Sequence, residues 1–390
     1  MKSEIMNRQF IRLILTNFCY WASLDIFMPV LPRYYDSLAF SGFEVGLVVG
    51  SVSSGGLLLR VVAGKAVDRF GTSPLVAIGL CLTLLAVGGY SLAKTLPLAM
   101  FCALVQGIGL ACYSGAALTM ATLMFEEIHT TEVFAWYSLL GMLGASLAMA
   151  AASPIYLLGG MSLVIKVGGA LALAALFLFP KRPAIRVKMT ASETRPIREI
   201  IVHPGVYLPT LSLLSTSLCF GGALTFLPLM MLGRGIADAT PFFAAYALSV
   251  IITRLFLRQI TRLASPERLT LVAVILMGLM MCLTSVTNSW PLLSFCGVLM
   301  GGALGMAFPV MGTIVTASTD PVNRGTAFGF FATAADLGFI LGSAGFGFAA
   351  VFTGYPGVFF LAGVYTLLYG TVYGIWLEKK ITRLTSKLSE

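Results

Sequence analysis

Residues 97–121 read PLAMFCALVQGIGLACYSGAALTMA, a run of apolar and small residues without a charged side chain. A helix needs about 20 such residues to cross the ~30 Å hydrocarbon core of a bilayer. Comparable runs with almost no charge recur from Phe10 to the region of Leu377. They predict a chain that crosses a membrane many times.

The composition of the whole chain agrees with this prediction. Of the 390 residues, 58% are hydrophobic and 11% are charged, whereas a soluble domain has roughly 25% charged residues. So few charges cannot cover a water-facing surface. The first apolar run is long enough to span and has no signal-peptide cleavage site, so it is expected to be a retained helix.

Charged residues and Pro/Gly-marked breaks divide the chain into twelve approximate spans. They are 10–31, 43–63, 74–93, 97–121, 132–153, 158–179, 206–231, 241–259, 268–288, 291–316, 326–350 and 356–377. The pattern predicts an all-α integral membrane protein with two bundles of six transmembrane helices.

A polar stretch, KRPAIRVKMTASETRPIREIIVHP at 181–204, divides the chain nearly in half. It is expected to be a cytoplasmic linker between an N-terminal bundle (1–180) and a C-terminal bundle with a short tail (205–390). With both termini in the cytoplasm, three of the 25 basic residues lie in outer loops and three inside spans, which leaves 19 inside. Basic residues accumulate on the cytoplasmic side, so this orientation in the cell (inner) membrane is expected, and no nucleic-acid partner.

The two halves resemble each other at a constant offset of 194 residues. The first helices match at an offset of 199, where Phe27 and Pro29 fall on Phe226 and Pro228. A sustained offset favours a duplicated unit, a plan in which the substrate site lies between the halves near the midplane. The pairs at offset 194 are Arg60/Arg254, Pro97/Pro291, Gly107/Gly301, Phe134/Phe328 and Gly144/Gly338.

After the second span the sequence reads Gly64-Lys65-Ala66-Val67-Asp68-Arg69-Phe70-Gly71. This resembles the Gly-x-Leu-Ala-Asp-Arg-x-Gly signature of the major facilitator superfamily. The resemblance implies the fold of that superfamily and a gate in which Asp68 braces the start of the eleventh helix near Thr326.

The end of the first helix, Asp25 to Pro32 (DIFMPVLP), is similar to the Pro-x-x-Pro ending found in the drug:proton antiporter branch. The chain departs from that branch at Ala103, where the family has an arginine associated with proton transfer. The helix-five Gly-Pro motif of antiporters is reduced to Ser153-Pro154. The resemblance therefore favours export, and leaves proton coupling to other residues.

Ionisable side chains inside hydrocarbon cost at least about 2.5 kcal/mol each on insertion scales, which makes them candidate functional groups. Asp25 and Asp336 are expected to include the proton-coupling site or a contact to a cationic substrate, with a structural ion pair as the alternative. A carboxyl in a low-dielectric site can take up and release a proton near neutral pH. Asn17 and Trp21 share the helix face of Asp25, and Thr333 that of Asp336 together with Thr326 and Ser343.

Arg60 and Arg254 are expected near the cytoplasmic ends of the second and eighth spans. There their long stems could reach the headgroups, as gate or surface anchors, with direct substrate contact as the alternative. Gln106 and Tyr113, seven residues apart on one helix face, could bind a substrate. The candidate aromatic walls, each with plain packing as the alternative, are Phe27, Trp136, Phe226, Tyr246, Phe330 and Phe331.

Other chemistry is not expected. The residues around Lys65 do not form a phosphate-binding loop, and His129 and His203 lack partners at metal-ligand spacing. The expected function is a monomeric, proton-coupled exporter of a small amphiphilic compound that works by alternating access, without cofactor or metal. The alternatives are a uniporter or proton symporter of a hydrophilic metabolite, and a non-transporting membrane sensor on the same scaffold.

Overall fold

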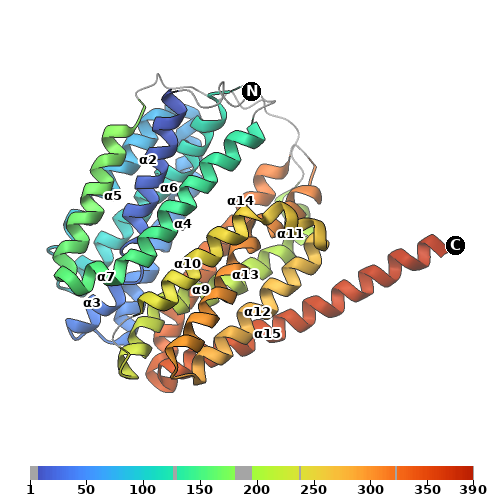
Figure 1. Ribbon diagram of the computed structural model, residues 1–390. Helices are drawn as coiled ribbons and strands as arrows, with labels where there is room; N and C mark the ends of the chain where they lie inside the picture. Colours follow the sequence, from blue (N-terminus) through green and yellow to red (C-terminus); the bar gives the residue numbers. More distant parts are fainter. Residues whose placement is uncertain (1–7, 126–129, 181–195, 237–238, 321–322, 390) are drawn as a thin grey trace.

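The computed structural model describes residues 8–125, 130–180, 196–236, 239–320 and 323–389, and every regular element in these ranges is helical. The helices form two bundles that lie side by side (Figure 1). The first contains α2 (Arg8–Asp25), α3 (Leu31–Ser37), α4 (Gly42–Phe70), α5 (Thr72–Gly89), α6 (Leu96–Thr122) and α7 (Thr130–Leu178).

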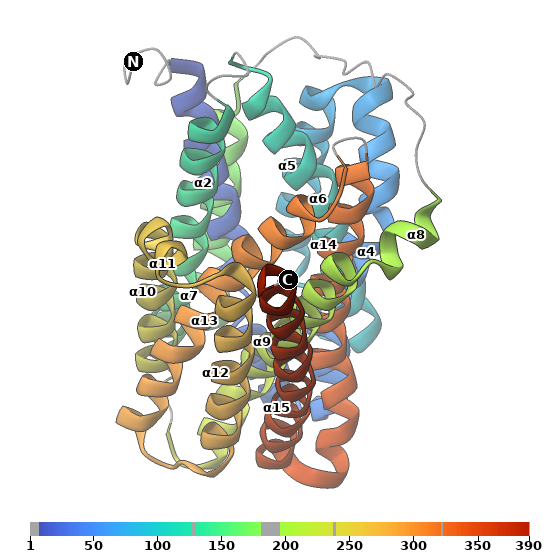
Figure 2. The same ribbon diagram turned by 90° about the vertical axis from the view of Figure 1, so that its right-hand side faces the viewer.

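The second bundle follows α8 (Ile197–Val202), which lies in the predicted linker; residues 181–195 of that linker lie outside the described part. A quarter turn of the molecule shows the second bundle from its outer side (Figure 2). Its elements are α9 (Pro204–Gly233), α10 (Thr240–Leu255), α11 (Leu257–Leu263), α12 (Pro266–Val286), α13 (Trp290–Ala317), α14 (Arg324–Ile340), a π-helical turn η3 (Leu341–Gly345) and α15 (Phe346–Ser389).

Two of the long helices contain a sharp break at glycine. The break in α7 lies at Gly159 and Gly160, and that in α15 at Gly354. Gly160 and Gly354 have φ values of 61° and 66°, which glycine adopts without steric cost. Each break lets the chain reverse direction, so α7 supplies two passes, and the break in α15 ends the pass begun by α14 and η3 and starts the last one.

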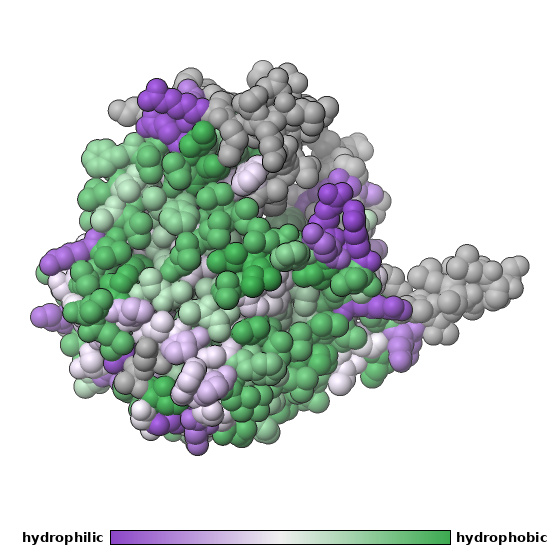
Figure 3. Space-filling model, viewed as in Figure 1, coloured by the Kyte–Doolittle hydropathy of each residue, from purple (hydrophilic) through white to green (hydrophobic). Residues whose placement is uncertain are grey.

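Among the described residues, eight helices are long and apolar enough to cross a membrane, or nine if the pair α10 and α11, bent by 71°, is one span. Dividing the two broken helices and adding α2 makes this consistent with the twelve expected passes. Apolar side chains cover most of the face in Figure 3, and hydrophilic ones gather at its margins. Exposed apolar surface on this scale fits a lipid environment.

The first span differs from the expected continuous helix over 10–31. The α-helix α2 ends at Asp25, and the chain passes through turns before α3 begins at Leu31. Pro29 and Pro32 explain the break, since proline lacks an N–H and its ring clashes with the carbonyl four residues earlier. Asp25 therefore lies at the C-terminal end of a helix inside the protein.

The signature segment 64–71 is not a loop but mostly the end of a helix, because α4 continues to Phe70. Helix α5 starts two residues later at Thr72. Gly71 alone separates them, with φ 88° and ψ 170°, a conformation essentially restricted to glycine. The final glycine of the signature is thus the turn between two spans.

Equivalent glycines make equivalent helix contacts in the two halves. A Cβ atom added at Gly107 of α6 would overlap the Val52 carbonyl oxygen of α4. One added at Gly301 of α13 would overlap the Tyr246 carbonyl oxygen of α10. Both the glycines and their partners are separated by 194 residues, so the offset found in the sequence relates two helix pairs that pack in the same way.

The end of the molecule at which α2 begins and α7 ends, uppermost in Figure 1, is called the linker end here, and the opposite end the far end. At the linker end, Arg12 of α2 donates from Nε to the Leu178 carbonyl oxygen (3.0 Å). Its Nη2 donates to the carbonyl oxygens of Phe177 (3.2 Å) and Phe179 (3.3 Å). These bonds satisfy carbonyls that the end of a helix leaves unpaired and tie the first pass of the bundle to the last.

Candidate functional site

An ion pair joins the two bundles near the middle of their length. Nη2 of Arg60 on α4 lies 2.7 Å from Oδ2 of Asp336 on α14. Arg60 is ten residues before the end of α4 and Asp336 twelve residues after the start of α14, which places them roughly 15 and 18 Å from the linker ends of their helices. Arg60 was expected near the cytoplasmic end of its span, as a gate or surface anchor; the candidate membrane span of α4 ends at Arg60, and its guanidinium points to a carboxylate of the other bundle.

A row of small and polar residues leads from the linker end of α14 to Asp336. Gly325, Gly329, Thr333 and Asp336 are spaced so that they lie on one helix face. Gly325 and Gly329 are exposed, and a Cβ atom added at either would meet nothing within 4 Å. The Asp336 side chain itself keeps 13% of its exposure. This face of α14 therefore carries no bulky side chain between the linker end and the carboxylate.

The far end is closed by a close contact of small residues between α4 and the segment after α14, which we call the far-end seam. A Cβ atom added at Gly46 would overlap the Ser343 carbonyl oxygen, and one at Gly50 would lie 3.0 Å from Ser343 Oγ. A Cβ atom added at Gly347 would lie 3.0 Å from the Gly42 carbonyl oxygen. Ser343, expected on the cavity face, is fully buried in this seam and donates to the Phe339 carbonyl oxygen.

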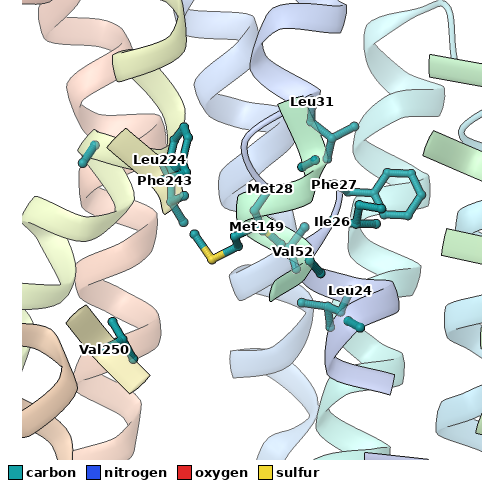
Figure 4. Close-up of a cluster of buried hydrophobic side chains, with 14 of the residues drawn as sticks. Leu24, Ile26, Phe27, Met28, Leu31, Val52, Met149, Leu224, Phe243 and Val250 are labelled. Atoms are coloured by element: carbon teal, nitrogen blue, oxygen red, sulfur yellow. The ribbon is translucent and has the colours of Figure 1, made fainter. Parts of the chain in front are cut away.

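Next to Asp25, apolar side chains of both bundles close the interface between them. Met28 and Met149 of the first bundle lie opposite Leu224 and Phe243 of the second, in one buried cluster (Figure 4). Such a cluster excludes water between the halves, so the interface is dry on the far side of Asp25.

Asp25 lies deep inside the protein but remains partly accessible to solvent. Met28, three residues further on, lies in the cluster opposite Leu224 and Phe243 of the second bundle. Tyr246 is buried and stacks with Phe220 (ring centroids 5.8 Å apart) and Phe242 (6.5 Å). Asp25 thus meets the interface between the halves, as Asp336 does, but at another helix pair.

Arg254 lies at the end of α10, just before the 71° bend into α11. It is partly buried. Its Nε atom is buried without a hydrogen-bond partner in the described part of the chain. The Nε atom of Arg60 is likewise buried without a hydrogen-bond partner among the described residues.

Gln106, Tyr113 and Asn17 are buried inside the first bundle, where most of their polar atoms bind neighbouring helices, but Gln106 Nε2 is buried without a hydrogen-bond partner in the described residues. Gln106 is fully buried and accepts a hydrogen bond of 2.6 Å from the Tyr90 hydroxyl. Tyr113 donates to Asn17 Oδ1 (3.3 Å), and Asn17 Nδ2 donates to the Tyr137 carbonyl oxygen (2.8 Å). In this conformation Tyr113 and Asn17 bind each other, whereas Gln106 keeps an amide donor without a partner in the described residues.

The candidate aromatic residues divide into two groups. Phe27, Phe226 and Phe331 are fully buried in hydrophobic clusters, and Tyr246 is nearly so. Trp21, Trp136 and Phe330 are partly buried and keep an accessible edge. The second group is the better source of a wall that a substrate could contact.

The proposed gate cannot be followed in full, since the side chains of Gly64 and Asp68 lie outside the described part. Arg69 is exposed, with its guanidinium 5.3 Å from the centroid of the Phe70 ring. Of the signature residues, Gly71 has a defined structural role as the turn between α4 and α5.

Sequence reasoning did not predict that Arg60 pairs with Asp336, nor the far-end seam. The pairing had a signal, because Arg60 and Asp336 are a cation and an anion that both lie inside spans, and isolated charges there seek partners. The seam had a weaker signal in Gly42, Gly46 and Gly50, a four-residue spacing of small residues that permits close helix approach.

These features define a class: a multi-pass helical membrane protein made of two repeated bundles, with ionisable groups buried between them. A family model described as "Major Facilitator Superfamily" matches residues 13–283 and 265–389. The chain therefore belongs to the major facilitator superfamily, and it is a membrane transporter rather than an enzyme.

Curated relatives cover most of the chain. The "uncharacterized MFS-type transporter YhhS" of Escherichia coli (strain K12) is 25% identical over 344 residues, 85% of this chain and 83% of that protein. The YhhS protein of Salmonella typhimurium is 27% identical over 350 residues with the same coverage. These relatives support the transporter class without naming a substrate.

Among solved structures, the nucleoside transporter NupG superposes with a TM-score of 0.74, at 15% identity, over 95% of this chain and 99% of that one. A bacterial homolog of the human lysosomal transporter Spinster, inward-facing and unoccupied, gives a TM-score of 0.69 at 15% identity, over 93% and 94%. At these identities the likeness shows the shared fold alone.

Proposed function

We propose that this protein is a secondary active transporter that exports a small amphiphilic compound in exchange for protons. The observation that carries the proposal is the Arg60–Asp336 ion pair, 2.7 Å long, which joins helices of the two bundles. A carboxylate at such a place links its protonation to the position of one bundle against the other.

The proposed cycle uses this link directly. When Asp336 is ionised, its attraction to Arg60 holds α4 and α14 together. When a proton binds to a carboxylate oxygen, the acid becomes neutral, the ionic attraction is lost, and the bundles are free to rock. The open face of Gly325, Gly329 and Thr333 lets Asp336 exchange protons with the linker side while the far-end seam is closed.

Exchange of substrate for protons then requires that binding of the substrate depends on the protonation state of Asp336. A substrate that displaces Asp336 from Arg60, or that binds only when the carboxyl is protonated or only when it is ionised, couples the two flows, because a ligand shifts an equilibrium by its differential affinity for the two states. The accessible edges of Trp21, Trp136 and Phe330 would bind the apolar part of the compound.

The linker end is proposed to face the cytoplasm of a cell whose inner membrane holds the protein. The support is the placement of 19 of the 25 basic residues on that side in the predicted topology. In this orientation the conformation described is open inward, and the protein is proposed to act as a monomer.

The test uses purified protein in liposomes, a pH gradient, and a panel of cationic, neutral and anionic amphiphilic dyes. We expect the native protein to concentrate at least one dye against its gradient. We expect Asp336→Asn to abolish this concentration while dye-for-dye exchange continues. Asp36→Asn, an acid on α3 away from the pair, is the matched control and should keep uphill transport.

Uphill transport by Asp336→Asn at the native rate would refute the coupling role. A native protein that moves a dye only down its gradient would be a uniporter, the alternative favoured by Ala103, which is fully buried and brings no ionisable group to α6. If no compound moves at all while binding is measurable, the non-transporting sensor is the correct class.

A further inference from the structure

Arg254 occupies the position in the second half that Arg60 occupies in the first. The two are 194 residues apart, the offset that also relates the contact of Gly107 with Val52 to that of Gly301 with Tyr246. The helices follow the same rule, because α4 packs against α14 and α10 packs against α7. The surroundings of Arg254 can therefore be compared with those of Arg60 position by position.

The comparison shows that the partner acid exists in one half only. Asp336 on α14 pairs with Arg60, and the residue 194 positions earlier, on α7, is Met142. The place equivalent to the carboxylate thus carries a thioether, which cannot neutralise an arginine. The duplicated site is a complete ion pair in one copy and a lone cation in the other.

No other acid takes the missing place. Within the described residues Arg254 makes no ion pair, and its Nε atom is buried without a hydrogen-bond partner. Asp25, the other acid at the interface, makes no ion pair with Arg254 among the described residues. A buried, unpaired charge is costly, which is why such residues in membrane proteins usually pair or mark a substrate path.

A surface role does not account for this arginine. Arg258 and Arg262, on α11 just beyond the bend, are exposed and already supply positive charge at the linker end. Arg254 instead lies in the last turn of α10, the helix that packs on α7 of the other bundle, at the linker end of that helix. A guanidinium in that position is available to a ligand that enters from there.

We propose that Arg254 binds the anionic group of the transported compound, so that the substrates are small organic anions. A guanidinium presents its N–H groups in a planar fork that matches a carboxylate, phosphonate or sulfonate. Phe220, which stacks on the buried Tyr246, is itself only partly buried and offers an apolar surface in the same bundle. This proposal rests on the proposed transport function and supplies its substrate class.

The test is a binding measurement on purified protein in detergent, because a ligand that binds only the folded state raises its melting temperature. The probes are benzoate, 2-naphthoate and phenylphosphonate, with neutral benzamide and cationic benzylamine as matched compounds. We expect the anions to stabilise the native protein and the matched compounds not to.

Two variants and one control identify the residue. Arg254→Gln is expected to weaken binding of the anions about ten- to a hundredfold, the usual loss for a hydrogen bond to a charged group. Met142→Asp, which restores the acid found in the other half, should neutralise Arg254 and weaken the anions similarly. Arg258→Gln, an exposed arginine four residues away, should bind them as the native protein does.

Three results would overturn the proposal: no anion of the panel stabilises the native protein, the matched neutral compounds stabilise it equally, or Arg254→Gln keeps the native affinity while folded. Since the measurement needs no gradient, it is separate from the coupling test. If the anions bind but transport is not coupled to protons, only the exchange mechanism is refuted. If transport is coupled to protons but the anions do not bind, only the substrate class is refuted.

Discussion

Substitution of Gly46 by alanine should push the conformational equilibrium away from the state described here. The added Cβ would overlap the Ser343 carbonyl oxygen and lie 3.1 Å from its carbonyl carbon, tighter than the 3.4 to 4 Å of ordinary contact. Backbone atoms on both sides leave no flexible side chain to yield. Overpacking of this kind costs about 1–3 kcal/mol, and because only the closed far-end seam suffers it, the ratio of the two states should change about 5- to 150-fold.

Hydrogen–deuterium exchange followed by mass spectrometry reads this shift directly. Uptake should rise in residues 42–50 and 341–350, which form the two sides of the seam, and fall along the linker half of α14. Gly88→Ala is the control, because a Cβ atom there meets nothing within 4 Å, and its exchange pattern should match the native one. If Gly46→Ala folds and exchanges like the native protein, the seam is not what holds the far end closed.

Three further predictions concern residues that hold the bundles together. Gly71→Ala should lower the free energy of unfolding by about 1–3 kcal/mol, since φ 88° with ψ 170° is strained for any other residue; chemical denaturation measures it, and an unchanged midpoint would contradict the turn geometry. Asn17→Ala should lower the free energy of unfolding by about 1 kcal/mol, because the hydrogen bond to the Tyr137 carbonyl oxygen is lost. Asn17→Asp keeps the oxygen acceptor but not the amide donor, so a comparison of the two variants tests whether the donor matters. Arg60→Gln and Asp336→Asn should be non-additive, so a double-mutant cycle in thermal stability that gives no coupling energy would argue against a direct interaction.

The fold was accessible from the sequence because lipid imposes a simple rule. A span must satisfy its backbone within one helix, so long uncharged runs and the breaks between them indicate the passes. What the pattern of runs could not show is a break inside a run. The turns after Asp25 and the continuation of α4 to Phe70 depend on proline and glycine geometry, and hydropathy does not register either.

The candidate site was predicted in part, for a comparable reason. Asp336, Arg60 and Arg254 stood out because charge inside a span is rare, and the structure pairs Asp336 with Arg60 across the two bundles. Which charges meet depends on how the helices are rotated and packed, and a sequence gives only which residues share a face. Gln106 illustrates the limit, since its partner, the Tyr90 hydroxyl, comes from a neighbouring part of the bundle.

The hydrogen bonds of Arg12 have a mechanical consequence. In a bundle of six consecutive helices, the first and the last are not adjacent in the chain and could separate under lateral pressure from the lipid. Arg12 fastens the first helix to the last through three carbonyl oxygens, so the bundle is closed into a ring. If α2 tilts, the other helices of the first bundle should therefore tilt with it, so that the bundle moves as a rigid body and α2 does not shift alone.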